Sequence, residues 1–200
     1  MMKIGITGGI GTGKTTVCKI FETLGIPVFN ADEESKNILL HNSSIHIELR
    51  KIFGEKIFSD GIPDRKKIAE IVFGSREKLE ALNAILHPAV ISASEKWFSM
   101  QKDKPYAIKE AALIFEVGGE KKLDKVIVVS APETISVQRI KQRDRVTEEE
   151  VRSRIQNQIP QKEKEARADF IIVNDDEHLI IPQVMDIHRQ LLRLHQIAEN

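Results

Sequence analysis

Residues 8–15 read Gly8-Gly9-Ile10-Gly11-Thr12-Gly13-Lys14-Thr15, which matches the pattern G-x-x-x-x-G-K-[ST] of the phosphate-binding P-loop. The glycines let the backbone curl without Cβ clashes, so that successive N–H groups point inward at one anion. Lys14 brings a positive charge to the β- and γ-phosphates of a nucleotide, and the Thr15 hydroxyl is placed to ligate Mg²⁺. The stretch therefore predicts a nucleotide-binding site made by Gly9, Gly11, Thr12, Gly13, Lys14, Thr15 and Thr16.

The context of the loop favours this interpretation over a glycine-rich turn that binds nothing. The short apolar run Ile4-Gly5-Ile6 precedes the loop and reads as a strand, and residues 16–21 read as a helix. A helix that begins at the loop adds its free N–H groups and the positive end of its dipole. Whether the protein switches, pumps or transfers phosphate must come from the rest of the chain.

Length and composition narrow the class of protein. The chain has 200 residues and 41% of them are hydrophobic, which allows one compact domain or a core with insertions. The 30 basic and 30 acidic residues cancel, which argues against nucleic acid as the main partner. The single cysteine, Cys18, rules out an internal disulfide, suits a reducing cytosol and is expected to be a buried small residue.

The sequence carries no sign of a membrane or export segment. No apolar run approaches the ~20 residues that span a bilayer. The first predicted strand begins at the N-terminus, so we expect no signal peptide before it. We therefore expect a cytoplasmic protein without a membrane partner.

Alternating strand and helix patterns predict an α/β fold. Five short runs read as strands, at 3–7, 26–29, 106–109, 125–130 and 168–173. Their order with the intervening helices predicts a parallel five-stranded sheet with right-handed crossovers, flanked by helices. With the P-loop, this is the nucleotide-kinase-like form of the P-loop NTPase fold. His188 and His195, in a last helix over about 178–198, are expected to be surface residues.

Two segments are expected to be inserted into this core. Residues 43–104 have helical spacing and no convincing strand, with a kink expected at Pro88, and such an insertion is a natural place for a second substrate. The charged segment 139–167, where Thr147 starts a helix, is either a solvated helical pair or a mobile lid. The P-loop favours the lid, because phosphoryl transfer must exclude water. We therefore divide a single domain into a core at 1–32, 105–138 and 168–200, a helical acceptor-binding insertion at about 33–104 and a helical lid at about 139–167.

Polar residues that follow predicted strands mark the edge of the sheet where ligands bind. Asn30 and Asp32 come after the second strand, at the carboxyl edge that also carries the P-loop. Either residue could instead cap the next helix. Glu110, just past the third strand, resembles the acid of a Walker B position.

Motifs along nearly the whole chain resemble those of the dephospho-coenzyme A kinase family. Residues 4–16 are close to the family's L-T-G-G-I-G-S-G-K-S, and 24–28 with Ala31-Asp32 resemble its L-G-x-x-V-I-D-A-D. The further matches are Leu86-His87-Pro88 to its H-P pair, Leu113-Ile114-Phe115-Glu116 to P-L-L-F-E, Gln142-Arg143-Asp144 at the start of the lid, and Ala168-Asp169 with Asn174 to the final A-D…N. Many kinases share the P-loop, but this set in this order is specific.

The resemblance implies transfer of the ATP γ-phosphate to the ribose 3′-hydroxyl of dephospho-coenzyme A, the last step of coenzyme A biosynthesis, with Mg²⁺ as cofactor. It implies that Asp32, Lys14 and Arg143 are catalytic. Asp32 would be the general base, or at least the group that orients the hydroxyl. Arg143 would reach the ATP phosphates from the lid and stabilise charge in the transition state, and Arg139 could assist.

The same resemblance assigns the helical insertion to dephospho-coenzyme A. Arg65 and His87 are candidate contacts to this substrate, together with Asp32. For His87, a structural role beside the expected kink is an equal alternative. The partners implied are ATP and dephospho-coenzyme A, while a monomer and a weak homo-oligomer are both open.

Two residues depart from the family pattern. Asn30 stands where the family has the first Asp of D-A-D, so a direct electrostatic role at this position is in doubt, whereas the role of Asp32 is not. Ala112 replaces the proline before L-L-F-E, which relaxes a turn without changing any chemistry.

Three other kinds of protein would use the same loop. Another small-molecule P-loop kinase, for nucleosides or nucleotides, would share the lid and its arginine, but the D-A-D-like and L-L-F-E-like segments argue against it. A regulatory GTPase would need N-K-x-D and D-x-x-G, and the sequence contains neither pattern. A non-catalytic nucleotide-binding module would leave Asp32 and the arginine-rich lid unexplained.

Overall fold

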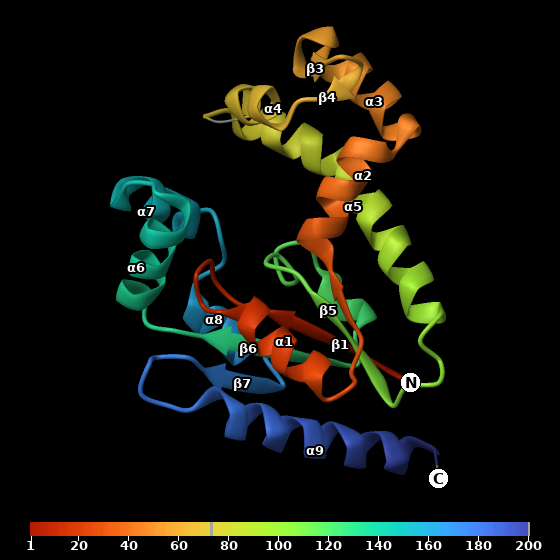
Figure 1. Ribbon diagram of the computed structural model, residues 1–200, viewed down its shortest axis with the longest axis vertical. Coiled ribbons are helices and arrows are strands. Elements are labelled where there is room, and N and C mark those ends of the chain that lie inside the picture. The colour runs from red at the N-terminus through yellow and green to blue at the C-terminus, as the bar shows by residue number, and fades with distance from the viewer. Residues whose placement is uncertain (73, 200) are drawn as a thin grey trace. The chain divides into compact units, whose positions relative to one another are not determined.

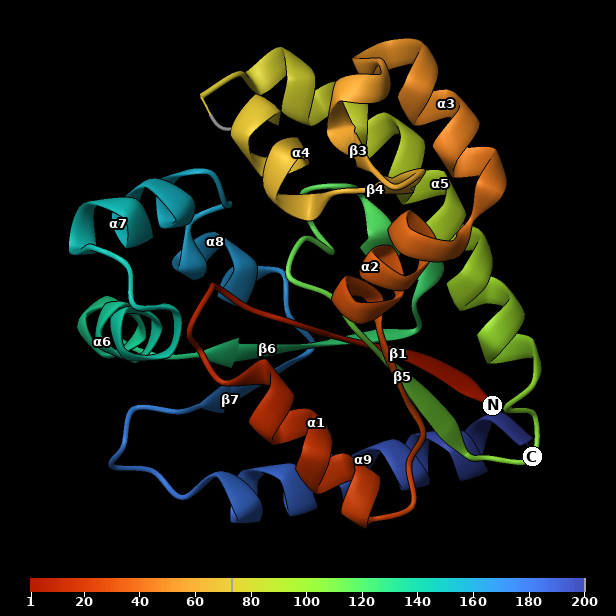
Figure 2. The same cartoon turned by 45° about the horizontal axis from the view of Figure 1, so that its top comes forward.

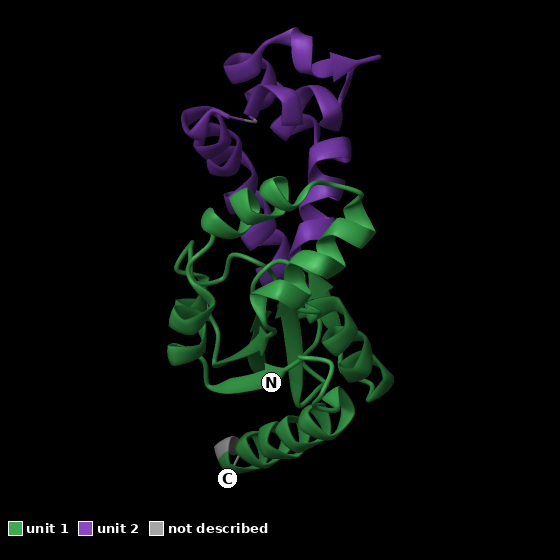
Figure 3. Cartoon of the chain, turned by 90° about the vertical axis from the view of Figure 1, so that its left-hand side faces the viewer, with its two compact units in different colours: residues 1–30, 98–200 green, residues 31–97 purple. Residues whose placement is uncertain are grey.

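The computed structural model describes residues 1–72 and 74–199, and the chain divides into two compact units (Figure 3). One unit comprises Met1–Asn30 and Phe98–Asn200, and the other comprises Ala31–Trp97. The first unit carries the P-loop and all five strands of the main sheet.

Every strand of the five-stranded sheet runs parallel to its neighbours (Figure 1). The order is β2-β5-β1-β6-β7, with bounds Val28–Asn30, Tyr106–Glu110, Met2–Thr7, Lys125–Ser130 and Phe170–Val173. Ile4 of the central strand pairs with Ile108 of β5 on one side and with Lys125 of β6 on the other. The predicted parallel five-stranded sheet is thus confirmed. β2 and β7 each begin two residues later than expected, and for β2 this follows because Pro27 has no N–H to donate to a ladder.

Helices α1 (Lys14–Thr23) and α9 (Ile180–Glu199) pack on the same face of this sheet. Phe21 of α1 and Leu191 of α9 are fully buried in one apolar cluster with Ile4, Ile108 and other strand residues. On the opposite face, Phe115 packs with side chains of β6. Burial of these apolar surfaces is the main stabilising term of the core.

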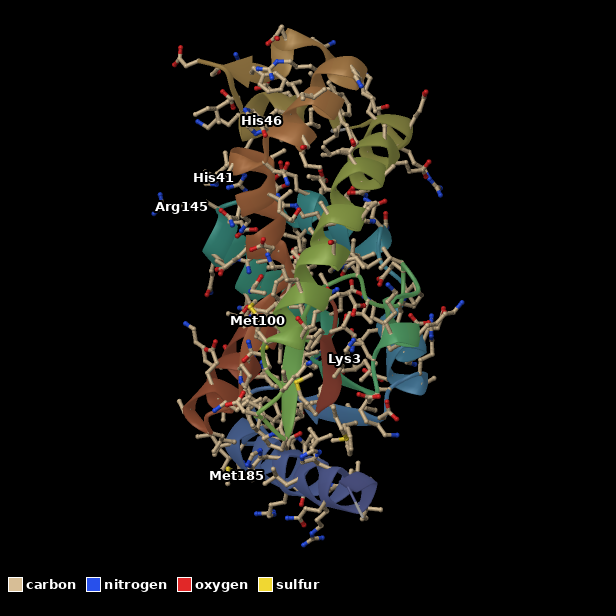
Figure 4. All side chains as sticks on the ribbon, turned by 90° about the vertical axis from the view of Figure 1, so that its right-hand side faces the viewer. Lys3, His41, His46, Met100, Arg145 and Met185 are labelled. Carbon is tan, nitrogen blue, oxygen red and sulfur yellow. The ribbon has the colours of Figure 1, made fainter. Side chains whose placement is uncertain are left out.

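The remaining elements of the first unit are short helices. They are the 3₁₀ helix η2 (Gly119–Lys122), α6 (Glu133–Asp144), α7 (Glu148–Gln156) and α8 (Gln161–Ala166). Arg145, labelled in Figure 4, ends α6 in a left-handed backbone conformation with φ of 55°. Thr147 caps α7 in a capping box with Glu150, which confirms the helix start predicted there. In the same view, Lys3 marks β1, with its amine 5.5 Å from the ring centre of Phe98.

The second unit is mainly helical and has a small core of its own. Its helices are α2 (Ala31–His41), α3 (Ser43–Phe53), the 3₁₀ helix η1 (Glu55–Ile57), α4 (Arg65–Val72) and most of α5 (Arg76–Ser99). Leu49 and Ile57 are fully buried in it. The side chains of Asn42 and Asp64 accept hydrogen bonds from the first N–H groups of α3 and α4.

The expectation of no strand in 43–104 was wrong. Strands β3 (Phe58–Ser59) and β4 (Ile62–Pro63) form an antiparallel ribbon, with Asp60 and Gly61 in its turn at φ of 50° and 79°. Strands of two residues cannot show the alternating pattern by which strands are found in a sequence. At Pro88, where a kink is expected, α5 continues on both sides of the proline, so the helix is not divided there.

Among the described residues, no helix has the length and apolar character needed to cross a membrane.

Tyr106 and His188 form a polar contact between β5 and α9. The Tyr106 hydroxyl lies 2.5 Å from Nδ1 of His188. Burial raises the pKa of Tyr106, and loss of solvent lowers the pKa of His188. At neutral pH the imidazole is therefore neutral, and it shares a hydrogen bond with the protonated tyrosine hydroxyl. His188 is half-buried, so the expectation that it is an ordinary surface residue was wrong.

This contact predicts a loss of stability in acid. Because the pKa of His188 is lower in the folded chain, protons bind preferentially to the unfolded chain as pH falls below about 6.5. Charging this half-buried imidazole costs folding free energy, and a cost of about 1 kcal/mol corresponds to a fall in Tm of about 2–4 °C for a chain of this length. We expect the fall in Tm between pH 7.5 and pH 5 to be smaller in His188→Asn, which keeps an acceptor but does not titrate. Equal falls in both proteins, measured by thermal melts, would contradict this.

Candidate active site

The P-loop joins β1 to α1 (Figure 2), and Gly11 and Gly13 are among its positions that only glycine can occupy. Gly13 precedes α1 at φ of 94°, and a Cβ there would lie 2.2 Å from Nδ2 of Asn174. Gly11 has φ of 82°, and its Cβ would lie 2.6 Å from the carbonyl oxygen of Ser136. Within residues 1–72 and 74–199, the N–H groups of Gly11 and Gly13 have no hydrogen-bond partner. These two N–H groups can therefore bind an anion.

Two side chains of the loop carry the remaining features expected of a nucleotide site. The Lys14 amine donates to the carbonyl oxygens of Gly8 and Gly9, at 3.0 Å each, so its charge lies against the loop. The Thr15 hydroxyl donates to Oε1 of Glu110 at 3.1 Å.

Glu110, at the end of β5, is the buried carboxylate of the site, with 6% of its surface exposed. Its other oxygen, Oε2, accepts a hydrogen bond of 2.9 Å from the side-chain amide of Asn30. An aspartate at position 30 would put a second negative charge beside this carboxylate, which raises the cost of keeping both ionised. The sequence departure at Asn30 therefore suits a site whose negative charge is carried by Glu110.

Cys18, one helical turn after Thr15, lies against the same carboxylate. Its pKa is raised above the usual range, first by burial and then by the charge of Glu110. The residue is thus a neutral, buried thiol, as the sequence predicted.

The site has oxygen ligands that suit Mg²⁺ bound together with a nucleotide. The Thr15 hydroxyl and the Glu110 carboxylate are hard donors, and Mg²⁺ generally uses one or two protein oxygens, with phosphates and waters completing its shell. In the part of the chain that the structure describes, no group of three or more His, Cys, Asp and Glu side chains could hold a metal ion. The residues therefore fit Mg²⁺ brought in with a polyphosphate.

Arg139, expected from the sequence to assist at the phosphates, holds the loop that follows β7. Its guanidinium donates to the backbone oxygen and Oδ1 of Asn174, at 3.3 and 3.2 Å, and pairs with Asp176 at 2.5 Å. The side-chain amide of Asn174 donates in turn to the carbonyl oxygen of Thr12 at 2.8 Å. Arg139 thus supports the P-loop through Asn174.

Arg143, the expected lid arginine, lies on α6 with its side chain 65% exposed. It makes two hydrogen bonds to Asp144, at 2.7 and 3.2 Å, and Asp144 also accepts one from Arg154. The hydrogen bond from Arg143 is the main cause that lowers the pKa of Asp144.

Asp32, Arg65 and His87 all belong to the second unit. Asp32 is exposed in the first turn of α2, where a carboxylate stabilises the positive end of the helix dipole. It lies inside the helix, so it is not the capping residue before it. Arg65 is exposed at the first position of α4, and His87 is half-buried in α5.

Sequence reasoning missed three side chains that contact the P-loop. Asn174 was part of a family motif, but nothing in its position indicated a contact to Thr12. Gln158 and Gln161 reach the N–H groups of Ile10 and Gly9, and no pattern in the sequence indicates this. Such contacts join residues about 150 positions apart and have no periodicity.

Comparisons with known proteins agree with one another. The family model described as dephospho-CoA kinase matches residues 2–179. The dephospho-CoA kinase of Bacteroides fragilis is 36% identical over 186 residues, which cover 93% of this chain and 91% of the relative. The crystal structure of TT1252 from Thermus thermophilus is 31% identical, with a TM-score of 0.83 over 94% of this chain and 96% of that one. A dephospho-CoA kinase structure from Campylobacter jejuni is 29% identical, with a TM-score of 0.71 over 96% and 97% of the two chains.

Proposed function

This chain belongs to the dephospho-coenzyme A kinase family, and we propose that it transfers the γ-phosphate of ATP to the ribose 3′-hydroxyl of dephospho-coenzyme A. Members of this family phosphorylate dephospho-coenzyme A with ATP, a step of coenzyme A biosynthesis, and family membership supports this activity for the chain. The observation that carries the proposal is the P-loop, which combines open N–H groups at Gly11 and Gly13 with the Lys14 amine and the Thr15–Glu110 pair.

We assign the nucleotide to the P-loop residues Gly9, Gly11, Thr12, Gly13, Lys14, Thr15 and Thr16. The open N–H groups would bind the β-phosphate, and the Lys14 amine would exchange its loop carbonyls for oxygens of the β- and γ-phosphates. Positive charge at these oxygens stabilises the transition state, because negative charge moves onto the leaving ADP as the bond to the γ-phosphorus breaks.

We assign the acceptor side of the reaction to Asp32. Its carboxylate would accept the proton of the ribose hydroxyl while the oxygen of that hydroxyl forms its bond to the γ-phosphorus. Arg65 and His87 would bind dephospho-coenzyme A within the insertion. Arg143 would leave its exposed pair with Asp144 and contact the ATP phosphates as the lid closes. Arg139 would assist Arg143 at these phosphates.

We propose Mg²⁺ as the cofactor, held through Thr15 with Glu110 beside it. When bound, the ion would neutralise charge on the β- and γ-phosphates and hold them in line. A cytoplasmic location and action without nucleic acid or membrane partners complete the proposal.

Glu110→Gln tests the metal assignment. Glutamine keeps an acceptor oxygen for the Thr15 hydroxyl but removes the negative charge, so we expect the Mg²⁺ concentration for half-maximal activity to rise about 10–100-fold. The matched variant Glu22→Gln, at an exposed site on α1, should leave it unchanged. A Mg²⁺ titration of initial rates measures both, and equal Mg²⁺ requirements would refute the role of Glu110.

The activity itself is tested by ADP release with ATP and Mg²⁺, with dephospho-coenzyme A as acceptor. Nucleosides and nucleoside monophosphates serve as control acceptors. We expect release only with dephospho-coenzyme A. Release with a control acceptor instead would favour a nucleoside or nucleotide kinase with the same loop chemistry.

A further inference from the structure

Two glutamines, Gln158 between α7 and α8 and Gln161 at the first position of α8, bind the P-loop at Gly9 and Ile10. Oε1 of Gln161 accepts the N–H of Gly9 at 3.0 Å, and Oε1 of Gln158 accepts the N–H of Ile10 at 3.0 Å. These two N–H groups precede the open N–H groups of Gly11 and Gly13 in the loop. The glutamines thus hold one part of the loop and leave the anion-binding part open.

The orientation of the Gln161 amide follows from its other partners. Its Nε2 donates to the carbonyl oxygen of Val129 at 3.4 Å and to Oε1 of Glu165 at 3.3 Å. Glu165 is held in turn by the Ser130 hydroxyl at 2.5 Å. The opposite amide orientation would point an NH₂ group at the Gly9 N–H, so Oε1 must face the loop.

An ion pair holds the backbone between the two glutamines. Oε1 of Glu116 accepts the N–H of Ile159 at 3.1 Å and pairs with the amine of Lys164 at 2.7 Å. The same amine donates to the carbonyl oxygen of Ala112 at 3.3 Å, which also accepts the Thr7 hydroxyl at 3.2 Å. Ile159 is therefore tied to the end of β1, the strand that leads into the P-loop.

The Glu116–Lys164 ion pair is expected to contribute little to the free energy of unfolding. The Lys164 side chain is fully buried, and Oε2 of Glu116 is buried without a partner among the described residues. Burying two charges costs about as much as their attraction returns unless every polar atom is satisfied. The value of the pair therefore lies in fixing where residues 158–161 sit.

We propose that Gln158 and Gln161 are positioning residues that hold the P-loop in its nucleotide-binding conformation, kept in place by Glu116 and Lys164. The predicted effect on catalysis rests on the proposed phosphotransferase function. The predicted effect on nucleotide binding does not. If the loop loses the two glutamine oxygens that accept its N–H groups, only a fraction of the molecules keep the binding conformation. The apparent affinity for ATP is then the intrinsic affinity multiplied by that fraction. The two glutamines act on the nucleotide-binding loop, so the KM for dephospho-coenzyme A should not change.

The test replaces both glutamines with methionine, which has similar length and no comparable acceptor. We expect the Kd for ATP to rise about tenfold, as for a loop that is competent about one tenth of the time. The kcat at saturating ATP should stay within about threefold of wild type. Amide hydrogen exchange at Gly9 and Ile10, followed by NMR, should become faster. The matched variant Gln138→Met, at an exposed site on α6, should change none of these.

Two single variants keep the test decisive if the double variant does not fold. Gln158→Met should speed exchange at Ile10 and weaken ATP binding by a smaller factor. Gln158→Glu keeps an acceptor oxygen, so it should restore the slow exchange at Ile10. Unchanged ATP affinity and unchanged exchange in the methionine variants would overturn the proposal. Because both readouts are taken without an acceptor, they stay informative even if dephospho-coenzyme A is not phosphorylated.

Discussion

Asp32→Asn is expected to lower kcat by about 100-fold or more, because a general base typically contributes about 10²–10⁴-fold. Asparagine is nearly isosteric and can still orient a hydroxyl, but it cannot take a proton at neutral pH. The Kd for ATP should stay within a few-fold of wild type, since we assign the nucleotide to the P-loop. Steady-state kinetics with separate ATP-binding measurements give both values.

The neighbouring acid on α2 supplies the control for this variant. Glu33→Gln also removes a negative charge from the first turn of the helix, and it should leave kcat close to wild type. If Asp32→Asn keeps the wild-type kcat, Asp32 is not the base. If both variants lose activity equally, the effect belongs to the charge of the helix end rather than to proton transfer.

Lys14→Ala is expected to lower kcat/KM for ATP by about 10²–10³-fold, the usual cost of removing one donor that stabilises transition-state charge. The nucleotide affinity should fall as well, because the amine, which donates to the loop carbonyls of Gly8 and Gly9, would donate to the phosphates when the nucleotide binds. Lys19→Ala, at an exposed site on the same helix, should have no effect. Normal activity of Lys14→Ala would refute the assignment of the P-loop as the nucleotide site.

The strongly patterned parts of the fold could be predicted from the sequence. The P-loop follows one strand directly, and apolar runs such as Lys125–Ser130 identify buried strands by composition alone. The strand order could not be predicted, because nothing in the β5 sequence indicates that it pairs with both β1 and β2. The ribbon of β3 and β4 was missed for a related reason, since its two-residue strands carry no period.

Residues of the candidate site could be predicted where they belong to a sequence motif or follow directly on a predicted strand. Lys14 and Thr15 belong to a motif whose spacing has a physical cause, and Glu110 was recognised as an acid at the end of a strand. The supporting contacts were not predictable, because Gln161 meets Gly9 only after the chain between them has folded. Asn30 shows a similar limit, since the reason for an amide at this position is its hydrogen bond to Glu110 on the neighbouring strand.

The central claim is that this chain phosphorylates the ribose 3′-hydroxyl of dephospho-coenzyme A. The most direct measurement is to incubate the protein with ATP, Mg²⁺ and dephospho-coenzyme A and to locate the new phosphate in the product by ³¹P and ¹H NMR. We predict a single new phosphate monoester on the 3′ oxygen, with one ADP released for each product molecule. A phosphate on another hydroxyl, or no phosphorylated product under these conditions, would contradict the claim.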